Sequence, residues 1–143
     1  MRRDQDEEKK CGGDLTHRRC PMGKVMVVDD EVGICELLGS FLAAKNHEVY
    51  TAYDGPTALR KVREIKPEVV LLDVALPGMD GMEVLQEIRK IDPAIGVVMV
   101  TGLMDHDQAK KTFEMGAYDY VTKPVDFCYL DNVINAKIID LMG

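Results

Sequence analysis

Acidic, hydroxyl and amino side chains follow several short apolar runs in this sequence, at the points where buried strands would end. Three carboxylates, one hydroxyl and one amine share this placement: Asp29, Asp30, Asp73, Thr101 and Lys123. Carboxylates that lie close together repel one another and recruit a cation, and oxygen ligands favour a hard ion such as Mg²⁺. A carboxylate beside such an ion can act as a nucleophile toward a phosphoryl group, while lysine and threonine donate to the phosphoryl oxygens. These residue types therefore predict a magnesium site at which the protein itself accepts a phosphoryl group.

The apolar runs are rich in valine and bounded by polar residues, which is typical of strands buried on both faces of a sheet. We predict strands at residues 25–28, 48–53, 69–72, 97–100 and 118–121. Between and after these runs, apolar residues recur at helical spacing, which gives each of five helices one apolar face. These apolar stripes include Leu37, Phe113 and Leu141.

A strand followed by a helix, repeated five times, predicts an α/β fold with a doubly wound parallel sheet and helices on both faces. Ligands of such sheets bind beyond the carboxyl ends of the strands. The five candidate residues all lie at such ends, so folding would bring them to one edge although they are far apart in the sequence.

The first 23 residues differ from the rest, because they are polar, mixed in charge and without a sustained strand or helix period. We expect them to form a disordered leader, or to be residues added during expression or by an upstream start codon. Residues 24–143 would form a single domain. Cys11, His17 and Cys20 in the leader offer a second metal site, which the absence of a C-x-x-C pair disfavours. Cys35 and Cys128 are expected to be free thiols.

The composition narrows the class of protein. The chain has 143 residues and a net charge of −7, which argues against direct contact with nucleic acid. No apolar run approaches the roughly 20 residues that a membrane span needs. The charged N-terminus is unlike a secretory signal peptide, so we expect a cytoplasmic location.

Four sequence motifs resemble those of response-regulator receiver domains. VVLLDVALPGMDG at residues 69–81 is similar to the phosphoacceptor segment, and VVDDE at 27–31 is similar to the acidic pair. VTG at 100–102 and GAYDYVTKP at 116–124 resemble the switch threonine and the closing lysine motif. The resemblance extends over about residues 24–141, and it implies the flavodoxin-like (βα)5 sheet with strand order 2-1-3-4-5.

The resemblance implies a role for each matching position. Asp73 matches the phosphoacceptor and also binds the metal, Asp30 matches the direct metal ligand, and Asp29 matches the acid that binds the metal mostly through water. The backbone carbonyl of Ala75 matches the remaining protein ligand. The implied cofactor is therefore Mg²⁺.

Three further positions match residues that sense the phosphoryl group. Thr101 and Lys123 match the groups that hold its oxygens, and Tyr120 matches the aromatic residue that swings inward when Thr101 moves. The Lys123–Pro124 bond would be cis, as in the family.

The implied function is a phosphorylation switch in two-component signalling. A sensor histidine kinase would supply the phosphoryl group from a phosphohistidine. A downstream effector or a second copy of the chain would then bind a surface formed by the fourth helix, fifth strand and fifth helix. The chemistry acts on the protein itself, so we do not expect a conventional enzyme.

Other interpretations remain open at this point. Asp29 and Asp30 could simply cap a helix, Asp73 could belong to a turn, and Tyr120 could be ordinary packing. An Asp-nucleophile phosphatase of the haloacid-dehalogenase type is disfavoured, because it needs a second acid where Ala75 stands. A receiver that serves only as a docking scaffold, without phosphorylation, would be marked by loss of the acidic pair, Asp73 or Lys123, and all are present.

Overall fold

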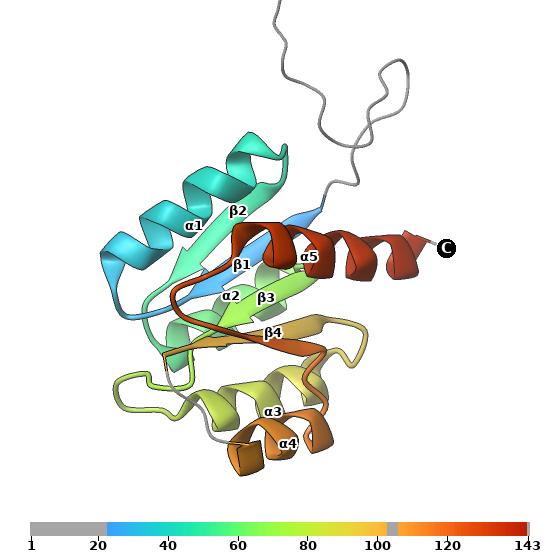
Figure 1. The fold of residues 1–143 in the computed structure, drawn as a ribbon. Helices are drawn as coiled ribbons and strands as arrows, with labels where there is room; N and C mark the ends of the chain where they lie inside the picture. Colours follow the sequence, from blue (N-terminus) through green and yellow to red (C-terminus); the bar gives the residue numbers. More distant parts are fainter. Residues whose placement is uncertain (1–22, 103–105, 143) are drawn as a thin grey trace, which may run out of the picture.

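A computed structural model of the chain describes residues 23–102 and 106–142. In these residues, five parallel strands form a single sheet in the order β2-β1-β3-β4-β5 (Figure 1). The strands are β1 (Lys24–Val28), β2 (Glu48–Ala52), β3 (Val69–Leu72), β4 (Gly96–Thr101) and β5 (Asp119–Thr122). The predicted fold and strand order are confirmed. The candidate metal site at Cys11, His17 and Cys20 lies outside the described residues.

Five helices cover the two faces of this sheet. They are α1 (Val32–Ala44), α2 (Gly55–Ile65), α3 (Gly81–Ile91), α4 (His106–Glu114) and α5 (Phe127–Met142). Helices α1 and α5 pack on one face and α2 and α3 on the other, where α4 also lies (Figure 1). No helix in the described part of the chain has both the length and the apolar composition needed to cross a membrane.

The interiors of the three central strands β1, β3 and β4 are apolar because both of their faces are buried. In β1, Val25 and Val27 pack against α1 and α5, whereas Met26 and Val28 pack against the helices of the opposite face. Successive side chains of a strand point to opposite faces, so a strand covered on both sides has no position left for a polar residue. This arrangement explains why the first polar residues appear where the strands end.

The loop after β3 is turned sharply back toward the sheet before α3 begins. Asp80 caps α3 with its carboxylate, which accepts from the N–H of Met82, while Glu83 accepts from the N–H of Asp80. Gly81 lies directly against the backbone of Asp73, and a Cβ at this position would collide with the Asp73 carbonyl oxygen. A glycine is therefore needed to bring the start of α3 close to the end of β3.

Two expectations about local structure were wrong. Leu37, Phe113 and Leu141 are exposed although they belong to the apolar stripes. Leu37 is 55% exposed while its neighbour Leu38 is 2% exposed, because adjacent helical residues point about 100° apart and only one can face the sheet. Strand β5 is shifted by one residue from 118–121.

The buried His47 should make the stability of the fold depend on pH. Its Nδ1 accepts from the N–H of Gly23 at 3.2 Å, so the imidazole is neutral there. Burial lowers the pKa of His47 below its ordinary value of 6.5, although the charges of Asp131 and Glu68 oppose this shift. Below that pH the unfolded chain takes up the proton more readily than the folded protein. The contribution of His47 to stability is therefore complete above pH 6.5 and is lost as the pH falls below it.

We expect a His47→Asn variant to reduce this loss, because an amide oxygen can replace Nδ1 as acceptor but does not titrate. The measurement is the urea-derived free energy of unfolding at several pH values between about 7.5 and 5.5, compared with the wild type. Equal slopes for the two proteins would assign the pH dependence to other groups.

Candidate functional site

The site lies at the carboxyl end of the sheet, where backbone hydrogen bonds extend the strand pairing by one residue. The N–H of Asp73 donates to the carbonyl of Val28 at 3.0 Å, and the N–H of Asp29 donates to the carbonyl of Ala52 at 3.1 Å. The backbones of both aspartates are thus held by neighbouring strands. This geometry brings together residues from β1 and β3 that are separated by more than forty positions.

Three aspartates form an acidic cluster at this edge. One carboxylate oxygen from each of Asp29, Asp30 and Asp73 lies within 4.8 Å of the others. Asp29 and Asp73 are buried, whereas Asp30 is exposed, so the cluster is open to solvent on one side. Ala75 is exposed in the same loop, and its N–H donates to Asp73 Oδ1 at 3.1 Å. Oxygen ligands at this spacing could bind a metal ion, and their chemistry fits a hard cation.

Lys123 reaches into the acidic cluster from the end of β5. Its Nζ lies 2.7 Å from Asp29 Oδ2 and 3.5 Å from Asp73 Oδ2. The N–H of Lys123 donates to the carbonyl of Thr101 at 2.8 Å, and the following bond to Pro124 is cis, as predicted. The structure therefore brings together the lysine and all three aspartates that the sequence singled out.

The negative charge of Asp73 is only partly compensated by the positive charge of its neighbours. Burial raises the pKa of Asp73 and the nearby Asp29 raises it further, while the Ala75 N–H and the Lys123 ammonium act in the opposite direction. Burial alone would lower the pKa of Lys123, but its hydrogen bond to Asp29 and the charge of Asp73 raise that pKa above the ordinary value. The ammonium group thus stays protonated, and one cation serves several carboxylates. A second cation would relieve the remaining repulsion.

Glu31 is a participant in this site to which the sequence analysis assigned no role. Its Oε1 lies 3.3 Å from Lys123 Nζ, and its side chain is 63% exposed. Glu31 occupies the position that caps α1, yet its side chain makes no capping hydrogen bond. The only signal in the sequence was its place directly after the acidic pair, which does not reveal a contact with a residue 92 positions away.

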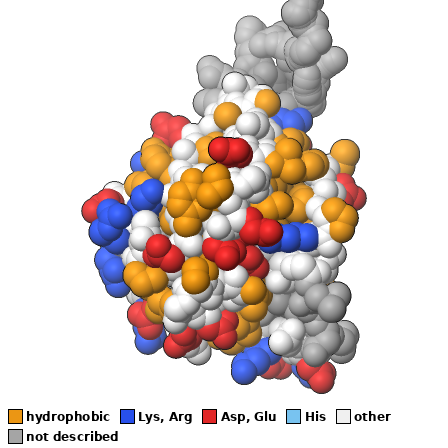
Figure 2. All heavy atoms as spheres, turned by 90° about the vertical axis from the view of Figure 1, so that its left-hand side faces the viewer, with side chains coloured by type: hydrophobic (Ala, Val, Ile, Leu, Met, Phe, Trp, Pro, Cys, Tyr) orange, Lys and Arg blue, Asp and Glu red, His pale blue; other side chains and the backbone are white. Residues whose placement is uncertain are grey.

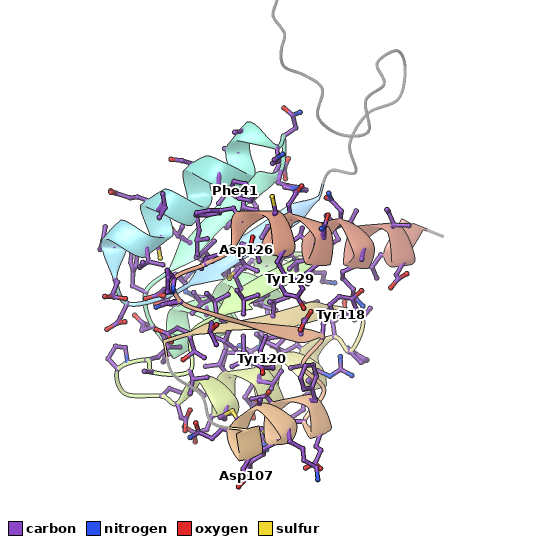
Figure 3. All side chains as sticks on the ribbon, in the orientation of Figure 1. Phe41, Asp107, Tyr118, Tyr120, Asp126 and Tyr129 are labelled. Atoms are coloured by element: carbon purple, nitrogen blue, oxygen red, sulfur yellow. The ribbon has the colours of Figure 1, made fainter. Side chains whose placement is uncertain are left out.

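Thr101 and Tyr120 occupy different parts of the molecule. Thr101 is buried at the end of β4, on the edge of the sheet where the aspartates lie. Tyr120, labelled in Figure 3, is half-buried on β5. Its ring packs edge-on against Phe113 of α4 with 5.7 Å between ring centroids. A groove of about 470 Å³ beside this ring pair is lined by Tyr120 and α4 residues. Tyr120 therefore faces α4, away from the acidic cluster.

Cys35 lies beneath the site as a buried free thiol, and Cys128 is a free thiol at the surface. The Cys35 thiol donates to the backbone carbonyl of Asp29 at 3.3 Å, and burial raises its pKa to about 11. It is therefore protonated at neutral pH and unreactive, and its contribution is to support the backbone of Asp29. The predicted free state of both cysteines is confirmed.

The side of the molecule that carries the carboxyl ends of the strands is shown in Figure 2. Acidic side chains gather near its centre, and hydrophobic side chains surround them.

Comparisons with known proteins agree with this geometry. Residues 25–135 match the family model of the response regulator receiver domain. A response regulator receiver domain protein from Clostridium thermocellum is 35% identical, with a TM-score of 0.79, over 83% of this chain and 96% of that chain. A CheY-like receiver domain protein from Methanospirillum hungatei JF-1 is 28% identical, with a TM-score of 0.79, over 83% and 95%. NtrX from Brucella abortus is 35% identical, with a TM-score of 0.77, over 83% of this chain but only 27% of its own length.

Proposed function

Because the chain belongs to the response regulator receiver family of two-component signalling, we propose that Asp73 accepts a phosphoryl group from a histidine kinase with the help of Mg²⁺. The observation that carries this proposal is the position of Asp73. It is a buried carboxylate that lies beside two further acids and 3.5 Å from a lysine ammonium group. Receiver domains interact with histidine kinases and effector domains, which is consistent with this role.

The residues around Asp73 could have different roles in phosphoryl transfer. Its Oδ1 accepts from the N–H of Ala75, which fixes the orientation of the carboxylate. A carboxylate oxygen would attack phosphorus while the bond to the histidine nitrogen breaks and its electron pair leaves with the imidazole. Lys123, together with the Thr101 hydroxyl, would donate to the phosphoryl oxygens.

The acidic cluster would hold the magnesium ion. Asp29, Asp30 and Asp73 would supply carboxylate oxygens, and Ala75 would supply its backbone carbonyl. A bound Mg²⁺ would neutralise charge on the incoming phosphoryl group. The donor set favours this ion, because it consists of oxygens alone and is open to water on the side of Asp30.

Mg²⁺ is expected to stabilise the wild-type protein against urea, since it relieves the repulsion between buried carboxylates. At a concentration about 100 times the dissociation constant, binding to the folded state alone adds about 2.7 kcal/mol. An Asp30→Asn variant should lose most of this gain but keep its metal-free stability, because Asp30 is exposed. Unfolding curves with and without Mg²⁺ measure both effects, and Ca²⁺ tests the preference for a small ion. An equal gain in wild type and variant would place the ion elsewhere.

The direct test of the function is phosphorylation by a small donor. The protein is incubated with Mg²⁺ and acetyl phosphate, and the intact mass is recorded with and without EDTA. We expect the gain of one phosphoryl group that depends on Mg²⁺. No gain in a protein that binds Mg²⁺ would favour the alternative of a docking scaffold. Sustained release of inorganic phosphate from many phosphoesters would instead support a phosphatase, which the missing acid at Ala75 disfavours.

We also propose that phosphorylation acts by changing the conformation of a binding surface, and that the protein does not release a reaction product. The transfer modifies the protein itself, so the chain is not a conventional enzyme. Phosphorylation would draw Thr101 toward Asp73 and release Tyr120 from its place against Phe113. The surface of α4, β5 and α5 would then bind an effector or a second copy of the chain. We propose that the protein acts in the cytoplasm, where a histidine kinase and an effector would meet it.

A further inference from the structure

The position of Lys123 shows an unexpected competition within the site. Its Nζ is closer to Asp29 Oδ2, at 2.7 Å, and to Glu31 Oε1, at 3.3 Å, than to Asp73 Oδ2, at 3.5 Å. The proposed function requires the ammonium group to donate to a phosphoryl group on Asp73. The three carboxylates thus share the Lys123 ammonium group, which phosphoryl transfer requires at Asp73.

Glu31 differs from the other two carboxylates in what it does for the fold. Asp29 belongs to the acidic cluster and accepts from the N–H of Glu31 at 2.9 Å. The Glu31 backbone carbonyl accepts from the N–H groups of Ile34 and Cys35, so the start of α1 is held by the backbone of this residue. The Glu31 side chain takes no part in this cap and is directed instead to Lys123. Its carboxylate is therefore free to act on the lysine alone.

The exposure of Glu31 suits a contact that opens during the reaction. Ion pairs between exposed groups contribute little to stability and are screened by salt, so such a pair breaks at low cost. Asp29 would turn toward the bound cation once the acidic cluster is filled. Glu31 would then be the one carboxylate on Lys123 that neither the metal nor the phosphoryl group needs.

We propose that Glu31 is a positioning residue that holds Lys123 away from Asp73 and thereby slows phosphoryl transfer. The inference rests on the proposed function. Removing the Glu31 charge would leave Lys123 with one competing carboxylate fewer to leave before it reaches the phosphoryl oxygens. Because the pair is exposed, the effect is modest, and we expect about a two- to fivefold faster reaction.

The experiment compares phosphorylation rates of the full chain with acetyl phosphate at saturating Mg²⁺ for wild type, Glu31→Gln and Glu36→Gln. Glu36 is an exposed residue of α1, the helix that Glu31 precedes, and it is outside the contacts of Lys123. Its replacement changes the net charge by the same amount as Glu31→Gln. We expect a faster rate only for Glu31→Gln, with an unchanged Mg²⁺ midpoint and an unchanged melting temperature. The gain should shrink in high salt, which already weakens the pair in the wild type.

The possible outcomes separate this inference from the function on which it rests. A wild type that accepts no phosphoryl group would contradict the proposed function and this inference with it. A phosphorylated wild type with no gain, or a loss, in Glu31→Gln would overturn the inference alone. The same gain in Glu36→Gln would assign the effect to net charge, and a shifted Mg²⁺ midpoint would assign it to the metal site; either result also overturns the inference.

Discussion

An Asp73→Asn variant is expected to lose phosphoryl uptake while gaining stability in the absence of metal. An amide oxygen is a poor nucleophile and cannot form the acyl phosphate, so uptake should fall by at least about 100-fold. The amide still presents an oxygen to the N–H of Ala75, so the loop should keep its conformation. Intact mass after incubation with acetyl phosphate and Mg²⁺ measures the loss.

The gain in stability follows from the charge that the substitution removes. Burial and the neighbouring Asp29 raise the pKa of Asp73, so the folded protein binds the proton more tightly than the unfolded chain. The stability linked to this group is complete below the ordinary pKa of 3.8 and is lost as the pH rises through the raised value. At neutral pH the charge therefore opposes folding, and its removal should stabilise the metal-free protein by about 1 kcal/mol.

Asp92→Asn provides the matched control for this variant. Asp92 ends α3 at the surface and accepts from the N–H of Ala94, so an asparagine there preserves the local contact. It should leave both uptake and stability unchanged. Normal phosphorylation of Asp73→Asn would show that another residue is the acceptor, and a loss of metal-free stability would show that the contact with Lys123 outweighs the repulsion.

A Lys123→Met variant is expected to lose stability and to become strongly dependent on Mg²⁺. The ammonium group contacts the nearly inaccessible carboxylates of Asp29 and Asp73, and its loss leaves two buried charges without a cation. Removing one partner from a buried ion pair costs about 3–5 kcal/mol. Since Lys123 is 18% exposed, water screens part of this loss, and we expect about 1–3 kcal/mol.

Urea unfolding with and without Mg²⁺ tests this expectation. Mg²⁺ should restore most of the stability of Lys123→Met, because the ion replaces the missing charge beside the same carboxylates. The control is Lys90→Met, which breaks an exposed pair with Glu87 and should cost less than about 0.5 kcal/mol. A Lys123→Met protein as stable as the wild type without metal would mean that the aspartates are protonated or solvated in the folded state.

The amino-acid sequence by itself determined the fold class and identified the three aspartates and the lysine that the structure brings together. A strand buried on both faces must be apolar along its whole length, so the runs that became β1, β3 and β4 could be identified without knowledge of their neighbours. Parallel strands place their carboxyl ends on one edge. Five strand–helix units therefore predicted Asp29, Asp73 and Lys123 at the same edge of the sheet.

The tertiary structure alone decided which atoms of that site touch. Lys123 is closer to Asp29 and Glu31 than to Asp73, and Tyr120 lies against Phe113 of α4. Hydrophobic periodicity can assign each of these residues to a strand or a helix, but it cannot identify the residue that it contacts. The distances depend on where each loop leaves the sheet. The same limit applies to Leu37 and Leu38, because a helical pattern identifies an apolar stripe but the packing partner determines which of two adjacent leucines is buried.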